Sequence, residues 1–270
     1  MGIPVLIMGF SGSGKSTSMR NFGKNEIALV NVNSKPLPFR THFTNTINSD
    51  NYADITAFIK RQTTKIIVID DSQYLMLNEF MRRSQEKGYQ KYTDIGKSFW
   101  ELIRLSEQLP PDVVVYFFQH VETGEDGRLK AKTVGKLLDN QINVEGMFTI
   151  VLKTLVTDGK YLFATQTDGT DTCKSPYGMF DSMHIPNDLK SVDDVIRSYY
   201  GFTEGEKCTQ CGNDILPTKQ KTIREIVDGS MKVYGKKMCW SCVMQEFKRR
   251  KETEISATEG VSGNNGPESS

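Results

Sequence analysis

Eight residues near the start of the chain have types and a spacing suited to phosphate binding. They read Gly9-Phe10-Ser11-Gly12-Ser13-Gly14-Lys15-Ser16 and fit the pattern G-x-x-x-x-G-K-[ST]. Glycines let the backbone take positive φ angles and approach an anion closely, so that N–H groups can surround phosphate oxygens. In this P-loop pattern the lysine reaches the β- and γ-phosphates and the serine hydroxyl binds Mg²⁺. We therefore expect Gly9 to Thr17 to bind ATP with Mg²⁺, and Lys15 to act in catalysis as well.

The same chemistry needs a carboxylate close to the loop. The run Ile66-Ile67-Val68-Ile69-Asp70 is typical of a Walker B strand, and its final carboxylate would hold the Mg²⁺ shell together with Ser16. We expect this strand to lie beside the strand that leads into the P-loop. Asp71 follows directly, and neighbouring strand residues point to opposite faces. Asp71 is therefore a candidate general base, or else a cap for the helix expected from Gln73.

Further polar residues are candidates for the catalytic machinery. Glu122 is a second candidate base, just past an apolar strand. Gln119 and His120 end that strand, where a polar side chain could touch the γ-phosphate and report its hydrolysis to another segment. Lys130 and Lys132 lie on the Gly-flanked segment 124–136. They could complete the ATP site of a neighbouring subunit or contact a nucleic-acid backbone, and a solvated loop is the third reading.

These residues need a scaffold of strands alternating with helices. The expected strands are Ile3–Met8, Ile27–Val32, Lys65–Asp70, Val113–Phe118 and a hairpin of Met147–Val156 with Lys160–Thr167. The expected helices are Thr17–Phe22, Asp54–Lys60, Gln73–Glu86, Thr93–Leu109 and Asp188–Tyr199. The first of these would place its N-terminal dipole at the phosphate loop. This alternation predicts an α/β fold with a mainly parallel sheet and an added edge hairpin.

The composition sets limits on the class of protein. The 270 residues carry a net charge of only +1, so no whole-chain field points to nucleic acid or to a membrane. No apolar run approaches the roughly 20 residues that span a bilayer, and the P-loop stands where a cleavable leader would be. We expect a cytoplasmic protein without a membrane partner. Its five cysteines are then metal ligands or free thiols, and the isolated Cys173 is a free thiol.

Four of the cysteines form two closely spaced pairs. Cys208 and Cys211 make one C-x₂-C pair, Cys239 and Cys242 make the other, and 27 residues separate the pairs. Four thiolates in this pattern give the tetrahedral shell of structural Zn²⁺, although a redox pair or an iron–sulfur cluster would also use them. We expect residues 1–200 to form the nucleotide-binding domain, 201–207 a linker, 208–251 a small Cys₄ zinc module and 252–270 a disordered tail.

The cysteine module is basic. From Lys207 to Lys251 there are 11 Lys and Arg against 4 Asp and Glu, a net charge of +7. Tyr234, Trp240 and Phe247 stand among these charges. Cations bind a nucleic-acid backbone and rings stack on bases, so single-stranded DNA is a predicted partner of this module. The alternative is a solubilising basic surface with Trp240 packed over the zinc site.

Together these segments resemble the phage-encoded AAA/RecA-like ATPases. The resemblance rests on Gly9–Ser16, Ile66–Asp70, Asn33–Phe39, Gln119-His120 and Lys130–Lys136, and more narrowly it points to the Sak-type single-strand annealing proteins. It implies a RecA-like core over about residues 1–200, binding of ATP, Mg²⁺ and single-stranded DNA, and assembly of a homo-oligomer as a ring or filament. It also implies a role in phage recombination or replication in the host cytoplasm, with a single-strand binding protein as a further partner.

One departure from that family concerns hydrolysis. RecA-like enzymes carry a glutamate at the end of the strand after the P-loop helix, whereas this strand ends in Val30-Asn31-Val32-Asn33. We therefore expect an ATP hydrolase that turns over slowly and is stimulated by DNA. Two other classes stay open: a P-loop kinase of a small metabolite, and a protein that uses ATP only as a ligand for assembly or loading.

Overall fold

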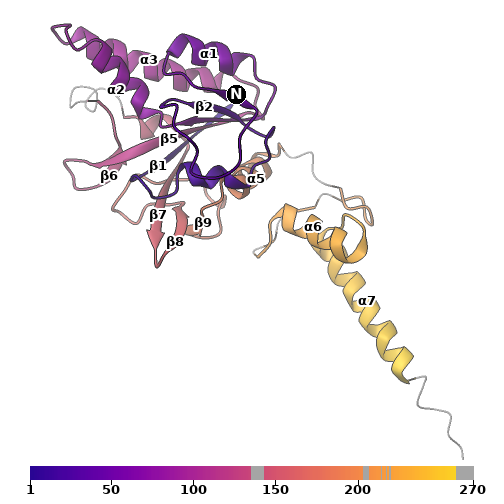
Figure 1. Cartoon of the computed structure of the whole chain (residues 1–270). Coiled ribbons are helices and arrows are strands. Elements are labelled where there is room, and N and C mark those ends of the chain that lie inside the picture. Colours follow the sequence, from indigo (N-terminus) through magenta and orange to yellow (C-terminus); the bar gives the residue numbers. More distant parts are fainter. Residues whose placement is uncertain (135–142, 203–206, 214, 217, 219, 260–270) are drawn as a thin grey trace, which may run out of the picture. The chain divides into compact units, whose positions relative to one another are not determined.

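The computed structural model describes residues 1–134, 143–202, 207–213, 215, 216, 218 and 220–259. The chain divides into two compact units, Met1–Asp193 and Asp194–Ser270 (Figure 1). Each unit has its own apolar core. The division falls inside helix α5 (Leu189–Tyr200), somewhat before the predicted linker at 201–207. Residues 203–206 of that linker lie outside the described part of the chain.

A mostly parallel sheet forms the centre of the first unit, with nine strands among the described residues. The order is β3-β2-β4-β5-β1-β7-β8-β9, and β6 pairs with β5. The strands are β1 (Ile3–Gly9), β2 (Ala28–Asn31), β3 (Asn45–Ile47), β4 (Ile66–Asp70), β5 (Val114–Thr123), β6 (Leu129–Ala131), β7 (Ile150–Thr157), β8 (Lys160–Ala164) and β9 (His184–Pro186). Among the described strands, the antiparallel pairs are β5–β6, β7–β8 and β8–β9. The predicted α/β class is confirmed, and the sheet is compatible with a Rossmann-like or RecA-like core.

Helices cover both faces of this sheet. The helices α1 (Tyr52–Lys60), α2 (Gln73–Arg82) and α3 (Gln90–Glu107) group together in Figure 1. Phe58 of α1 and Phe99 of α3 share one buried cluster with Leu6 and Met8, the alternate residues of β1. On the opposite face, the Tyr116 hydroxyl of β5 is hydrogen-bonded to Asp193 of α5 at 2.8 Å. A parallel sheet buried in this way explains the almost continuous apolar runs of its strands.

Most predicted elements are present, with differences at short or irregular segments. The segment after the P-loop is a 3₁₀ helix, η1 (Ser16–Asn21), and not the predicted α-helix. Six residues of 3₁₀ helix align few peptide dipoles, so the helix dipole expected at the loop is weak. The three-residue strands β3, β6 and β9 were not predicted, because so short a segment has no apolar periodicity to detect.

The second unit holds two helices and the cysteines. Helix α6 (Ile223–Tyr234) begins with a capping box between Thr222 and Glu225 and ends at Gly235, whose φ is 66°. Helix α7 spans Trp240–Glu259, so the disorder predicted from Glu252 is wrong up to Glu259. The run Lys-Glu-Thr-Glu-Ile-Ser-Ala-Thr-Glu there contains good helix formers, and polarity alone was a poor guide. Residues 260–270 of the predicted tail lie outside the described part of the chain.

Within the described residues, no helix combines the length and apolar character needed to cross a membrane.

Candidate functional site

The phosphate-binding sequence forms the connection between β1 and η1. Gly12 and Gly14 take positive φ angles of 77° and 100°, a conformation that glycine adopts without strain. Gly9 has no room for a side chain, because a Cβ there would collide with the Thr154 hydroxyl of β7. That hydroxyl also lies 2.5 Å from the Ser13 hydroxyl, which is bonded to the Phe10 carbonyl at 2.6 Å. The neighbouring strand β7 therefore fixes the loop shape through Thr154, a residue that the sequence did not single out.

The outer residues of the motif remain accessible. Phe10 is 56% exposed, Ser11 is exposed and Thr17 is half-buried. Ser13 and Gly14 are buried in the loop. The predicted nucleotide-binding residues thus form one continuous turn around the end of β1.

Lys15 points back into its own loop. Its Nζ donates hydrogen bonds to the carbonyls of Gly9, at 2.8 Å, and of Phe10, at 2.9 Å. The side chain is buried, and this burial lowers the pKa of Lys15 to about 8, although Asp71 and Asp70 oppose the shift. The amine is therefore held at the loop by two carbonyl bonds, which an anion bound there would replace.

Ser16 and Asp70 meet as the two motifs predict. The Ser16 hydroxyl lies 2.9 and 2.8 Å from the two carboxylate oxygens of Asp70. Burial and the neighbouring charge of Asp71 raise the pKa of Asp70 to about 6. A hydroxyl and a carboxylate are hard oxygen ligands of the kind that Mg²⁺ prefers, and their close approach would let one ion contact both.

The strand order differs from the expectation in one respect. β4, which ends in Asp70, does not lie beside β1, because β5 is inserted between them and pairs in parallel with both. The register places His120 opposite Gly9 and Gln119 opposite Met8. The end of β5 therefore lies between the P-loop and the Asp70 carboxylate.

Asp71 adopts a left-handed conformation and is held by three side chains. Its φ is 60°, which costs about 1 kcal/mol or more for a residue with a Cβ. The Asn33 amide donates to Asp71 at 2.8 Å, Lys35 Nζ lies at 3.4 Å and His120 Nε2 at 3.5 Å. Burial alone would raise the pKa of Asp71. The hydrogen bonds from His120 and Asn33 and the charge of Lys35 outweigh burial and hold this pKa well below its usual range.

The turn that bends Asp71 is anchored to the inserted strand. The backbone N–H and the hydroxyl of Ser72 both donate to the Phe118 carbonyl, at 2.8 and 2.9 Å. The Gln73 side chain accepts from the His120 N–H at 3.1 Å. Helix α2 begins after Ser72 without a side-chain cap, so Asp71 does not cap the helix with its side chain. Asn33 and Lys35 join the cluster without having been predicted as site residues.

Gln119 connects the strand end to the following hairpin. Its side chain is fully buried, and its Nε2 donates to the Lys132 carbonyl at 2.8 Å. The Lys132 N–H in turn donates to the His120 carbonyl at 2.8 Å, while the Lys132 side chain is exposed. Any displacement of Gln119 would therefore move the backbone that carries Lys132.

Glu122 and Lys130 pair with each other on the β5–β6 hairpin. They face each other in the register, and Lys130 Nζ lies 3.7 Å from Glu122. Glu122 lies two residues beyond His120, about 7 Å further along the strand, where β1 has already ended. This placement favours an ion pair of the hairpin over the role of general base.

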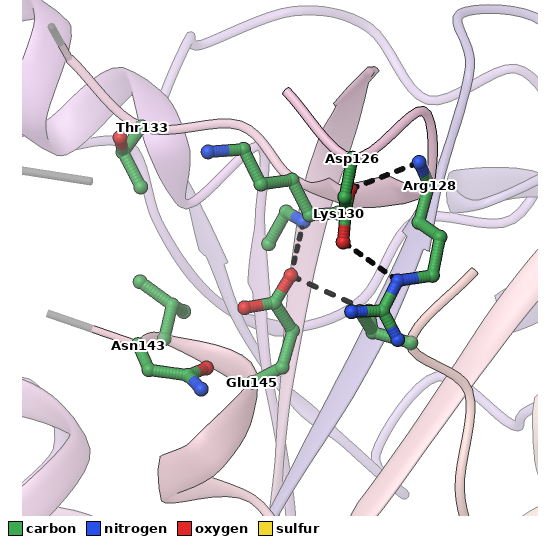
Figure 2. A pocket seen from close by; sticks show the side chains of 9 residues that line it. Asp126, Arg128, Lys130, Thr133, Asn143 and Glu145 are labelled. Carbon is green, nitrogen blue, oxygen red and sulfur yellow. Dashed lines mark hydrogen bonds and ion pairs between the residues drawn. The ribbon is translucent and has the colours of Figure 1, made fainter. Parts of the chain in front are cut away.

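The buried carboxylate of Glu145 is bonded to the β5–β6 hairpin. Glu145 accepts a hydrogen bond from the Ala131 N–H at 2.6 Å and lies 3.4 Å from the Thr172 hydroxyl. Figure 2 shows Glu145, Arg128 and Lys130 among the residues that line a pocket of about 210 Å³. Lys130 lies on β6 and Arg128 directly precedes this strand, while residues 135–142 lie outside the described part of the chain.

The four paired cysteines form a cluster that could hold a zinc ion. Their Sγ atoms all lie within 4.8 Å of one another, and those of Cys211 and Cys239 are 3.8 Å apart. A tetrahedron with Zn–S bonds of 2.3 Å has edges of about 3.8 Å, so the thiols fit the ion. Cys208 is buried, which disfavours the thiolate, but backbone N–H groups of Cys239, Cys211 and Gln210 outweigh this and lower its pKa to about 6. Cys173 lies in the other unit as a buried free thiol, as predicted.

Aromatic rings of the second unit are partly covered by cations. Lys221 lies over Trp240 at 4.6 Å and Arg250 over Tyr234 at 4.7 Å. Trp240 also packs against the core around Cys208 and Cys242, as the alternative interpretation of this residue expected. Phe247 is 48% exposed, and the run Lys248–Lys251 is exposed beside it.

A scan of the chain against protein-family models gave no match, and a search of the curated proteins gave none. The chemistry of the site is therefore inferred from its own residues.

Proposed function

We propose that this protein binds ATP with Mg²⁺ at the P-loop and hydrolyses it slowly in a reaction coupled to single-stranded DNA. The observation that carries the proposal is the meeting of Ser16 with both oxygens of Asp70, 54 residues apart in sequence. A chance Gly/Ser-rich turn would not require a buried carboxylate at its serine. Mg²⁺, when bound, would be held by these two side chains and would neutralise charge on the phosphates.

The residues around the loop suggest how a triphosphate would be handled. N–H groups of Gly12 to Ser16 would surround the phosphate oxygens, and Lys15 would exchange its bonds to loop carbonyls for bonds to phosphate. Hydrolysis breaks the bond between the γ-phosphorus and its bridging oxygen while a water oxygen bonds to that phosphorus, and the water loses a proton. His120 and Asp71, beside Gly9 and Lys15, are the groups placed to orient that water.

We expect slow turnover because Asp71 is a weak base. A general base works best when its pKa lies near the working pH, and the partners of Asp71 hold its pKa far below that range. Asp71 would therefore orient water well and accept a proton poorly. Gln119 would relay the state of the γ-phosphate to Lys132 through the carbonyl that it binds.

The proposed DNA partner rests on charge. The four exposed basic residues Lys248–Lys251 continue the +7 charge of the cysteine module, and Phe247 offers a ring for stacking. Lys130 and Lys132 are exposed or half-exposed cations on the fixed hairpin of the other unit. They suit contact with DNA or with the ATP site of a second copy in a ring or filament. By resemblance, the biological setting would be phage recombination or replication in the host cytoplasm, alongside a single-strand binding protein.

Multiple-turnover phosphate release, measured with and without single-stranded DNA, tests the proposal. We expect slow release that DNA accelerates, abolished by Lys15→Met and unchanged in the matched control Lys24→Met, an exposed lysine outside the loop. ATP binding without release in either condition would favour the assembly-ligand alternative. Phosphorylated nucleosides or sugars in the products would identify a kinase and refute the proposal.

The DNA site is tested by the salt dependence of binding. Replacing Lys248, Arg249, Arg250 and Lys251 by Gln should lower the slope of log K against log salt by up to about 3, since each lost contact to a single strand removes about 0.7. A control replaces four exposed lysines of the first unit by Gln: Lys24, Lys60, Lys87 and Lys97. An unchanged slope in the first variant would place the DNA site outside helix α7.

A further inference from the structure

A groove of about 410 Å³ lies between helices α6 and α7 of the second unit. Its volume is within the range of about 300–1,000 Å³ that is usual for ligand sites. Most of its lining is apolar, yet Val233 is 59% exposed, Phe247 48% and Met244 39%. Apolar side chains that are exposed together in one groove mark a surface that binds another molecule.

One face of each helix forms the groove, and a glycine keeps it open. The lining residues Ile226, Gly229 and Val233 follow the i, i+3, i+7 spacing of one face of α6, and α7 contributes Trp240 and Phe247 at the same spacing. A Cβ built on Gly229 would meet no atom within 4 Å. Glycine weakens the interior of a helix relative to other residues, and here it leaves free a space that a side chain would fill.

The aromatic rings that line the groove each have a cation beside them. The cations lie 4.6 to 5.6 Å from the ring centres: Lys221 over Trp240, Arg250 over Tyr234 and Lys251 over Phe247. The acidic groups on the same helices are bonded locally, since Glu225 belongs to the capping box of α6 and Glu246 is paired with Arg249 at 2.7 Å. Apolar walls with aromatic rings and a basic rim suit a ligand that has flat apolar faces and carries negative charge.

We propose that this groove binds an unpaired base of single-stranded DNA, while the phosphates on either side of that base contact the cations at the rim. The inference rests on the proposed binding of single-stranded DNA by the second unit. Phe247 is the exposed ring on which the base stacks, and the apolar walls exclude water from the faces of the base. A base within a duplex is paired and stacked, so it enters such a groove only if it is flipped out. The groove thereby gives the basic module a preference for single strands.

Fluorescence anisotropy of the full chain tests this with labelled oligothymidine and with an abasic oligonucleotide of the same length and charge. The wild type should bind oligothymidine about 5- to 100-fold more tightly, the range expected for the stacking of one base. Gly229→Leu fills the open space and should reduce that ratio to below about 3-fold, with an unchanged salt dependence because every cation remains. The matched control Gln245→Leu places the same side chain at an exposed position of α7 outside the groove, and it should retain the ratio.

The outcomes separate the two proposals. Equal affinity of the wild type for both strands, or an unchanged ratio in Gly229→Leu, would overturn base binding in the groove while electrostatic binding of DNA stands. The groove would then suit an apolar segment of a partner protein. Failure of both strands to bind the wild type would overturn both proposals. Phe247→Ala, which removes the exposed ring, should lower the ratio in the same way, and it serves as the second variant if the leucine form does not fold.

Discussion

Asp70→Asn should stabilise the protein without ligand while abolishing its Mg²⁺-dependent nucleotide binding. The buried carboxylate of Asp70 has a pKa raised to about 6 by burial and by the Asp71 charge. At neutral pH the folded protein must therefore hold an ionised group in a place that disfavours it. Asn has nearly the same shape, keeps an oxygen that can accept from the Ser16 hydroxyl, and carries no charge. The substitution also removes the proposed Mg²⁺ ligand.

The size of the effect follows from the pKa shift. The folded state binds the proton of Asp70 more tightly than the unfolded chain, whose aspartates titrate near 3.8. The contribution of this group to stability therefore falls as the pH rises from about 4 to about 6. Two pKa units correspond to about 3 kcal/mol, which is the expected gain for Asp70→Asn at pH 8. At pH 5 the same linkage leaves only about half of that gain, since the wild-type group is then mostly protonated when folded.

Urea unfolding of the full chain measures this gain. A Trp240→Phe background leaves Trp100 of α3 as the single tryptophan, so its fluorescence reports on the first unit. Asp71→Asn is the matched control, because the same chemical change should have the opposite sign one residue away. The bonds from His120 and Asn33 stabilise ionised Asp71, and that stabilisation is present at both pH 8 and pH 5. A loss of stability for Asp70→Asn at pH 8, or a gain that does not shrink at pH 5, would refute the reasoning.

Three further outcomes are expected. Gly9→Ala should lower stability by about 1–3 kcal/mol, because the added methyl group collides with the Thr154 hydroxyl, and Thr154→Ala in the same chain should recover part of the loss in a urea titration. Cys239→Ser should reduce bound zinc from one ion per chain to a small fraction, as measured by elemental analysis, and an unchanged zinc content would contradict a Cys₄ site. The affinity for Mg²⁺–ATP should be greatest between pH 6 and 8, because protons compete for Asp70 below about 6 and Lys15 loses its charge above about 8. A titration series that shows no decline at pH 5 would contradict the acid limit.

Local signals in the sequence were enough to predict the P-loop, the Walker B strand and the cysteine pairs. Each depends on residues close in sequence whose roles are set by backbone shape or ligand number. The glycines, lysine and serine of Gly9–Ser16 are enough to identify the phosphate-binding pattern, and the spacing of Cys208 and Cys211 is enough to predict a shared metal site. The apolar runs of β1, β4 and β5 likewise predict buried strands without knowledge of their neighbours.

The remaining site depends on the order of the strands, which no single segment encodes. The insertion of β5 between β1 and β4 brings His120 to the P-loop and to Asp71, and the sequence predicted a different neighbour for β4. Thr154 meets the loop from within β7, and Asn33 meets Asp71 from just beyond β2, only because the strand order brings these segments together. A serine, threonine or asparagine at the end of a strand is too common in sequences to be recognised as functional without that arrangement.

The adjacent aspartates of the β4 turn illustrate how the arrangement divides two tasks. If residue 71 continued the strand, its side chain would simply point away from that of residue 70. The left-handed turn instead keeps both charges near Lys15 while giving them different partners. Burial and the charge of Asp71 disfavour the ionised form of Asp70, and a bound cation would offset that cost. Asp71 has its charge satisfied by Asn33, Lys35 and His120 in the absence of any ligand, and it keeps its orientation when one arrives. A site built in this way should bind its cation strongly and extract protons weakly, which is the combination expected of a slow nucleotide hydrolase.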